Sequence, residues 1–82
     1  MEIEIIPLAL KKMQRRNITA EMVREVIKDP GQIVDGYMGR KVKQKIFYDR
    51  NGGDKILRVV YEEMAEKITV VTAYFTSKVE KY

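Results

Sequence analysis

The chain of 82 residues fits one compact domain, expected over residues 1–82, and its 45% hydrophobic content is enough for one small core. It has no cysteine and no histidine, which excludes disulfide bridges, thiolate or imidazole metal sites, and catalysis by a Cys or His side chain. The net charge of +4 is uneven, because segments 11–16 and 40–50 are strongly basic. No segment resembles a signal peptide or a membrane span, so we expect a cytoplasmic protein. We also expect that the protein needs no metal and no cofactor.

The first third of the chain predicts a short strand followed by two helices. Residues 1–6 alternate isoleucine with glutamate and end before a proline, which suits a strand and then the first turn of a helix. Apolar residues three and four positions apart indicate that helix, and its opposite face carries Lys11 and Arg15. Thr19 is placed to cap a second helix, which residues 29–31 end. The two helices are expected to form a tight hairpin.

Strand-like segments fill the rest of the chain, at residues 32–38, 40–48, 55–63 and 67–76. Asn51-Gly52-Gly53 is the strongest hairpin signal, because these residues reach positive φ cheaply. The connection at 64–66 lacks Gly, Asn and Pro, so only its flanking strands place it. The pattern predicts an α+β fold: an N-terminal short strand, then a two-helix hairpin packed on one face of an antiparallel four-stranded meander.

A row of basic side chains is the most informative feature. Lys41, Lys43 and Lys45 alternate with other residues, so in a strand their ammonium groups share one face. If the more apolar residues of each strand are turned toward the helices, the lysines lie on the open face together with Arg58 and Tyr74. Cations, hydroxyls and a phenol on an open sheet suit a phosphate backbone.

The same alternation assigns the remaining strand residues to the two faces. The set expected against the helices is Val42, Ile46, Tyr48, Leu57, Val59, Tyr61, Val71, Ala73 and Phe75. The set expected on the open face, besides the basic residues, is Ile56, Val60, Ile68, Val70, Thr72 and Thr76. A one-residue bulge would reassign a whole strand.

Each of these polar residues also has a purely structural interpretation. The lysine row is typical of a solvated strand that discourages edge pairing. Arg58 could be paired with Glu62 or Glu63, and Tyr74 could be a packed aromatic ring with its hydroxyl at the rim. The acidic positions around residues 49–54 do not have calcium-loop spacing and favour a hairpin turn. The sequence leaves the structural and functional interpretations of the polar face open.

Residues 9–19, together with the apolar segments 57–61 and 70–74, resemble an uncharacterised family of small domains. That family opens with His-Ala, then Arg-Met, then Arg-Gly-Ile-Ser, and its members are described as a domain of unknown function. Their helix pair followed by a meander is similar to the RelE-like and BrnT-like toxins. The family's His falls at Leu8 here and its Gly at Asn17, which can still adopt the left-handed conformation.

The resemblance to RelE-like ribonucleases implies metal-independent cleavage of RNA by attack of a 2′-hydroxyl on the adjacent phosphate. Arg58 would stabilise the phosphorane with Lys43 or Lys45, Tyr74 would be the general acid, and a lysine crowded by like charges would be the base. The nucleic-acid-binding candidates are Arg40, Lys41, Lys43, Lys45, Lys11, Arg15 and Lys78, and Tyr82 is a secondary candidate.

Two rival functions remain open. One is a non-catalytic interaction module whose edge strand or basic helix binds a protein, such as an antitoxin-like peptide or a second copy in a homodimer. The other is a ParE-like inhibitor of a DNA-handling enzyme, since one fold supports several functions.

Overall fold

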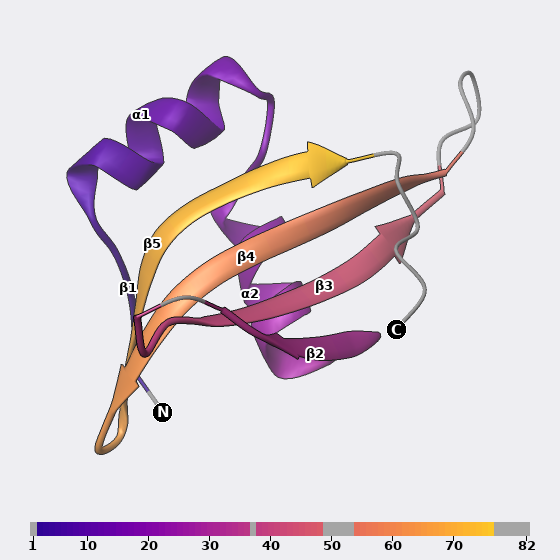
Figure 1. Cartoon of the computed structure of the whole chain (residues 1–82). Helices are drawn as coiled ribbons and strands as arrows, with labels where there is room; N and C mark the ends of the chain where they lie inside the picture. The colour runs from indigo at the N-terminus through magenta and orange to yellow at the C-terminus, as the bar shows by residue number, and fades with distance from the viewer. Residues whose placement is uncertain (1, 37, 49–53, 77–82) are drawn as a thin grey trace.

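The computed structural model describes residues 2–36, 38–48 and 54–76 (Figure 1). Its elements follow in the order β1 (Glu2–Ile5), α1 (Pro7–Arg15), α2 (Ala20–Lys28), β2 (Gln32–Asp35), β3 (Lys41–Phe47), β4 (Lys55–Met64) and β5 (Lys67–Thr76). The predicted α+β class is confirmed. The predicted hairpin turn at Asn51-Gly52-Gly53 lies outside the described residues. No helix in the described part of the chain is long and apolar enough to cross a membrane.

The sheet has five strands in the order β1-β5-β4-β3-β2, and it is mixed. Strands β2 to β5 pair antiparallel in sequence order, whereas β1 pairs parallel with β5. The predicted four-stranded, purely antiparallel sheet is therefore incomplete. Strand β1 joins because Ile3 and Ile5 pack against the common core, and because Lys67 forms ion pairs with Glu2 and Glu4 across the β1–β5 pair.

A β-bulge changes which side chains of β5 face the helices. Tyr61 pairs with Val70 but the preceding Val60 pairs with Thr72, so Val71 is an extra residue in β5. One extra residue reverses the alternation, which buries both Val70 and Ile68 in the core. The prediction that these two residues lie on the open face is wrong.

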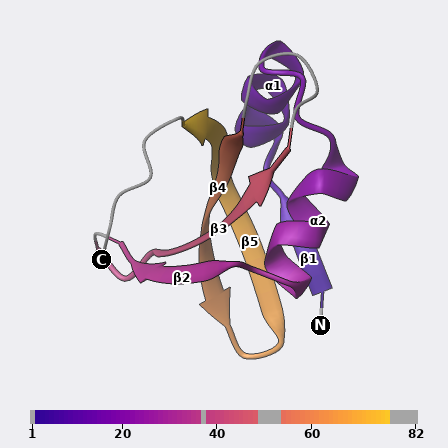
Figure 2. The ribbon, with the colours of Figure 1, turned by 90° about the vertical axis from the view of Figure 1, so that its right-hand side faces the viewer.

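Both helices cover the same face of the sheet, but over different strands (Figure 2). Helix α1 contacts β5, whereas α2 contacts β3 and β4. Helix α2 begins as predicted, because the Thr19 hydroxyl accepts a hydrogen bond from the Met22 backbone N–H at 3.1 Å. Asn17 has φ 58°, the left-handed conformation expected of it between the helices. The two helices thus pack on different strands and not closely on each other, so the predicted tight hairpin is wrong.

The core lies between the helices and the inner face of the sheet. Its cluster of buried residues consists of Met13, Ile18, Val23, Val26, Ile27, Leu57, Val59, Tyr61, Ile68, Val70 and Ala73. Strand β4 supplies the centre, because Leu57 and Val59 are fully buried between α2 and the neighbouring strands. Arg58 lies between them in sequence and therefore points to the opposite face.

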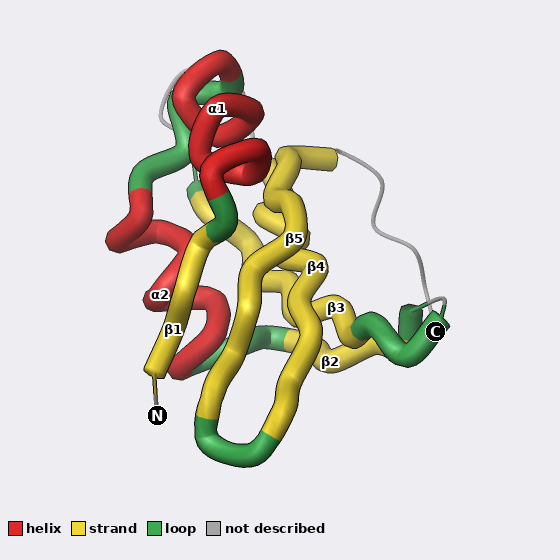
Figure 3. The backbone as a smooth tube through the Cα atoms, turned by 90° about the vertical axis from the view of Figure 1, so that its left-hand side faces the viewer, coloured by secondary structure: helices red, strands yellow, loops and turns green. Residues whose placement is uncertain are grey.

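The tip of the β2–β3 hairpin projects from the sheet on the side away from the helices (Figure 3). Gly36 N–H donates to the Arg40 carbonyl at 3.0 Å, which closes the turn. Gly39 has φ +78°, which suits glycine. This hairpin tip forms one side of a hollow on the outer face of the sheet.

Substitution of Ala65 by glycine is expected to stabilise the β4–β5 turn. Ala65 has φ 53°, and it is the first of the two residues between Met64 and Lys67, where a type II′ turn favours glycine. The left-handed conformation costs a non-glycine residue about 1 kcal/mol. We expect Ala65→Gly to raise the free energy of unfolding, measured by urea denaturation, by up to that amount. A decrease of the same size in the free energy of unfolding would contradict the turn assignment.

Candidate functional site

The lysine row of β3 faces α2, so its predicted place on the open face is wrong. Lys43 Nζ donates to the Ile27 carbonyl at 3.1 Å and lies 5.2 Å from the centre of the Tyr61 ring. Lys45 Nζ lies 3.3 Å from a Glu25 carboxylate oxygen and 3.2 Å from an oxygen of Asp29. The C-terminal end of a helix and nearby carboxylates attract cations, so these lysines fasten α2 to the sheet.

The environment of Lys45 does not suit a general base. Hydrogen bonds from its ammonium group to Asp29 and then to Glu25 raise the pKa of Lys45 above the ordinary value of 10.5. A raised pKa means that the folded protein holds this proton more tightly than the unfolded chain does. The proposed catalytic role of Lys45 is therefore not supported, and Lys43 is occupied by the Ile27 carbonyl.

The ion pairs of Lys45 predict a specific loss of stability at alkaline pH. Because the folded pKa is raised, their contribution is fully present below pH 10.5 and disappears as the pH rises through the folded pKa. We expect Lys45→Gln to be less stable than wild type at neutral pH, with the difference vanishing at high pH.

Urea denaturation across this pH range measures that difference in free energy of unfolding. Lys11→Gln, which changes an exposed lysine of α1, is the control and should show no such pH-dependent difference. A difference for Lys45→Gln that persists unchanged far above pH 10.5 would contradict the assignment.

On the opposite face, Arg58 and Tyr74 form a direct cross-strand pair between β4 and β5. The guanidinium carbon of Arg58 lies 6.0 Å from the centre of the Tyr74 ring. The Nε of Arg58 is buried and has no hydrogen-bond partner among the described residues. A buried N–H without an acceptor costs free energy. A ligand that supplies an acceptor to this guanidinium would remove that cost.

A concavity of about 390 Å³ covers this pair, between the β2–β3 hairpin tip and strands β4 and β5. Its lining consists of Val34, Asp35, Gly36, Met38, Arg40, Val42, Arg58, Val60 and Tyr74. Arg40 Nε lies 3.3 Å from a Glu62 carboxylate oxygen, and both side chains are about half exposed. Such an exposed pair contributes little stability, so Arg40 can exchange its partner for an anionic ligand. The concavity thus combines two guanidinium groups, a phenol and apolar walls.

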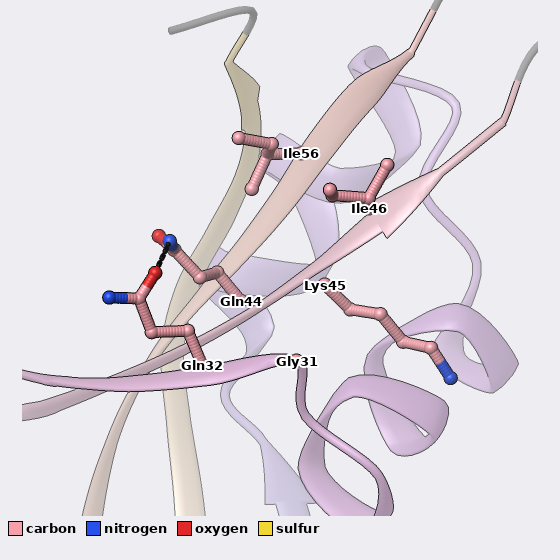
Figure 4. Close-up of a pocket in the computed structure, with 6 residues that line it drawn as sticks. All are labelled: Gly31, Gln32, Gln44, Lys45, Ile46 and Ile56. Carbon is pink, nitrogen blue, oxygen red and sulfur yellow. Dashed lines mark hydrogen bonds between the residues drawn. The ribbon is translucent and has the colours of Figure 1, made fainter. Parts of the chain in front are cut away.

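A smaller hollow of about 140 Å³ adjoins this region of the open face (Figure 4). Gln44 and Gln32 lie on it, and the Gln44 amide nitrogen donates to the Gln32 amide oxygen at 2.7 Å. Ile46 and Ile56 lie on the same side, whereas Lys45 points the other way, toward α2. The figure shows directly that successive residues of β3 alternate between the two faces.

The structure brings together Arg58, Tyr74 and Arg40 among the residues predicted from the sequence. It separates them from Lys43 and Lys45, which bind α2 on the other face. The remaining candidates are elsewhere: Lys41 is exposed on the helix-facing side of β3, Lys11 and Arg15 are exposed on α1, and Lys78 and Tyr82 lie outside the described residues.

Sequence reasoning missed Asp35 and Gln44. Gln44 carried a usable signal, because it is the polar member of the otherwise apolar alternation of Val42 and Ile46. Asp35 carried none, since its place at the concavity depends on the curvature of the β2–β3 hairpin.

Comparison with known proteins identifies the family. Residues 9–75 match the model of a family described as a domain of unknown function (DUF4258). No curated protein and no solved structure matches the chain. The match covers most of the sequence, including α2 and strands β2 to β4. The chain therefore belongs to the DUF4258 family of domains of unknown function.

Proposed function

We propose that this domain binds single-stranded RNA on the open face of its sheet, with a backbone phosphate in the concavity over Arg58. The observation that carries the proposal is the buried Arg58 Nε, which has no acceptor among the described residues. A guanidinium group matches the geometry of a phosphate and binds it with charge-assisted hydrogen bonds. Arg40 at the same concavity supplies a second cation.

A single strand suits this surface better than a duplex. The hairpin tip forms one wall of the concavity, and a narrow, extended chain fits beside such a wall more easily than a duplex does. Tyr74 and the apolar side chains of the open face offer a surface for unstacked bases, the usual basis of single-strand recognition. The net charge of +4 favours encounter with a polyanion.

The proposal extends to cleavage of the bound RNA strand, which the resemblance to RelE-like toxins supports. The RNA 2′-oxygen would attack phosphorus and the bond from phosphorus to the 5′-oxygen would break, leaving a cyclic phosphate and a 5′-hydroxyl. Arg58 would stabilise the phosphorane, and Tyr74 would donate a proton to the leaving 5′-oxygen. The 2′-hydroxyl proton would pass to solvent water, because Asp35, which also borders the concavity, is the direct partner of Lys41 and its carboxylate therefore lies on the helix-facing side.

The proposal is tested by adding the protein to labelled single-stranded RNA in EDTA and measuring fluorescence anisotropy and strand length together. With two arginine–phosphate contacts, we expect the logarithm of affinity to fall with a slope of about −1.4 against the logarithm of salt concentration. Absence of binding at low salt would overturn the proposal.

Tyr74→Phe separates binding from cleavage. If Tyr74 is the general acid, we expect this variant to bind RNA as wild type does but to cleave it at least about 100-fold more slowly. Salt-sensitive binding by wild type without any cleavage would leave an RNA-binding domain and eliminate the catalytic part.

The second candidate function is strand addition by a protein partner along β2. This strand is at the edge of the sheet, and its Ile33 is 61% exposed. Exposed edges pair with extended peptides, including a second copy of the same chain. A stable dimer or peptide complex by light scattering, together with no binding of RNA, would favour this function.

A further inference from the structure

We infer that the smaller hollow on the open face is a nucleobase subsite, in which the Gln32–Gln44 amide pair recognises the edge of one base. The inference rests on the proposed function, because it places the base of a nucleotide next to the phosphate site at Arg58. It defines the bound unit as a nucleotide and not as a phosphate alone.

The amide pair has unused hydrogen-bonding capacity. Gln44 is 8% exposed, and among the described residues it is the one polar residue that counts as buried. Its amide nitrogen donates to Gln32 Oε1 at 2.7 Å. No described residue donates a hydrogen bond to the amide oxygen of Gln44. A primary amide can donate two hydrogen bonds and accept two. Each amide in the pair therefore keeps free hydrogen-bonding positions at the hollow.

The free groups match the edge of a base. With Gln44 donating to Gln32, an acceptor oxygen remains on Gln44 and donor hydrogens remain on Gln32. If both amides flip, the donor and acceptor exchange places and the pair still presents one of each. Glutamine amides recognise a neighbouring donor and acceptor in this way, as in pairing with adenine N6 and N7.

Ile46 and Ile56 supply the apolar part of the subsite. They are direct cross-strand partners between β3 and β4 and lie on the same face as the two amides (Figure 4). Their side chains form an apolar surface beside the amide pair, where the face of a planar ring can pack. At about 140 Å³, the hollow is larger than a single water needs and admits such a ring.

The register of the sheet connects this subsite to the phosphate site. Gln44 on β3 is the direct partner of Arg58 on β4, which is in turn the direct partner of Tyr74 on β5. Adjacent strands lie about 4.8 Å apart, so the amide pair and the guanidinium are neighbours. One nucleotide can therefore place its phosphate on Arg58 and its base against Gln44.

Two short RNAs of equal length test the inference, one intact and one with a single abasic position flanked by ordinary nucleotides. We expect Gln44→Leu to bind the intact RNA about tenfold more weakly than wild type does, whereas the two proteins should bind the abasic RNA with equal affinity. Gln14→Leu, which changes an exposed glutamine of α1, is the control and should bind as wild type does. Thermal unfolding of both variants tests whether they are folded. We expect Gln44→Leu to fold, because leucine fills a buried position without needing a hydrogen bond.

A spectroscopic readout distinguishes the possible failures. In ¹H–¹⁵N spectra of the side chains, ribonucleoside monophosphates should shift the signals of Gln32, Gln44 and Arg58, while ribose 5-phosphate should shift Arg58 and leave both glutamine signals unchanged. If both ligands bind equally and leave the glutamine signals unchanged, the base subsite is refuted and the phosphate site stands. If neither ligand nor RNA binds, the proposed function and the inference fall together.

Discussion

Arg58→Gln is expected to weaken RNA binding by at least about tenfold and to lower the thermal midpoint only slightly, through loss of the guanidinium contact with the Tyr74 ring. Hydrogen bonds to a charged group contribute about 1.5–3 kcal/mol each, and a bidentate contact with phosphate makes two of them. In the free protein the Arg58 Nε has no partner among the described residues, so its removal breaks no hydrogen bond there. The loss should therefore be one of binding and not of folding.

Fluorescence anisotropy at one fixed salt concentration measures the affinity, and differential scanning fluorimetry measures the thermal midpoint. Arg24→Gln is the matched control, because it removes the same charge from an exposed position of α2 on the other face. Arg58→Lys should recover part of the affinity, since it restores the charge but not the planar fork. Equal affinities for Arg58→Gln and Arg24→Gln would mean that binding depends on net charge alone.

Leu57→Ala is expected to produce the opposite pattern, a large loss of stability with the binding face unchanged. Leu57 is fully buried in the core, and truncation of such a leucine costs about 2–5 kcal/mol. For a domain of this size, that loss lowers the thermal midpoint by more than about 10 °C. Below its transition the variant should bind RNA as wild type does, because Leu57 and Arg58 point to opposite faces of β4.

Urea denaturation gives the free energy of unfolding for this variant. Leu57→Met, which nearly conserves side-chain volume, is the control and should lose less than about 1.5 kcal/mol. If Leu57→Ala instead lost RNA affinity at a temperature where it is fully folded, the separation of the two faces of β4 would be contradicted.

The parts of the fold that local signals determine could be predicted from the sequence. The cap at Thr19, the left-handed Asn17 and the end of α2 before Pro30 are each encoded by residues within about one turn of the feature itself. Arg58 and Tyr74 were expected on the same face, which is confirmed. Their direct pairing was not predictable, because the register between strands depends on the whole sheet.

The lysine row was misplaced for a physical reason. Hydrophobicity suggested that Val42 and Ile46 should face the helices, but the C-terminal end of α2 offers the Ile27 carbonyl and nearby carboxylates. Those acceptors hold Lys43 and Lys45 on the inner face and turn the apolar residues outward, to line the two hollows. Hydrophobic patterns alone do not include the position of a helix end.

Two long-range features also had no local signal. The bulge between Val60 and Tyr61 reverses the alternation of β5, and nothing in the residues themselves marks it. The parallel pairing of β1 with β5 joins the two ends of the described chain, and it follows from the packing of Ile3 and Ile5 against the common core.

The Hε–Nε signals of the arginine side chains, followed by NMR during titration with single-stranded RNA, test the phosphate site most directly. We expect the signals of Arg58 and Arg40, which line the concavity, to shift together and saturate. Arg16, which donates to the Ala73 carbonyl at 2.8 Å, and Arg24 on α2 should not move. An unmoved Arg58 signal at RNA concentrations that saturate binding would contradict the account.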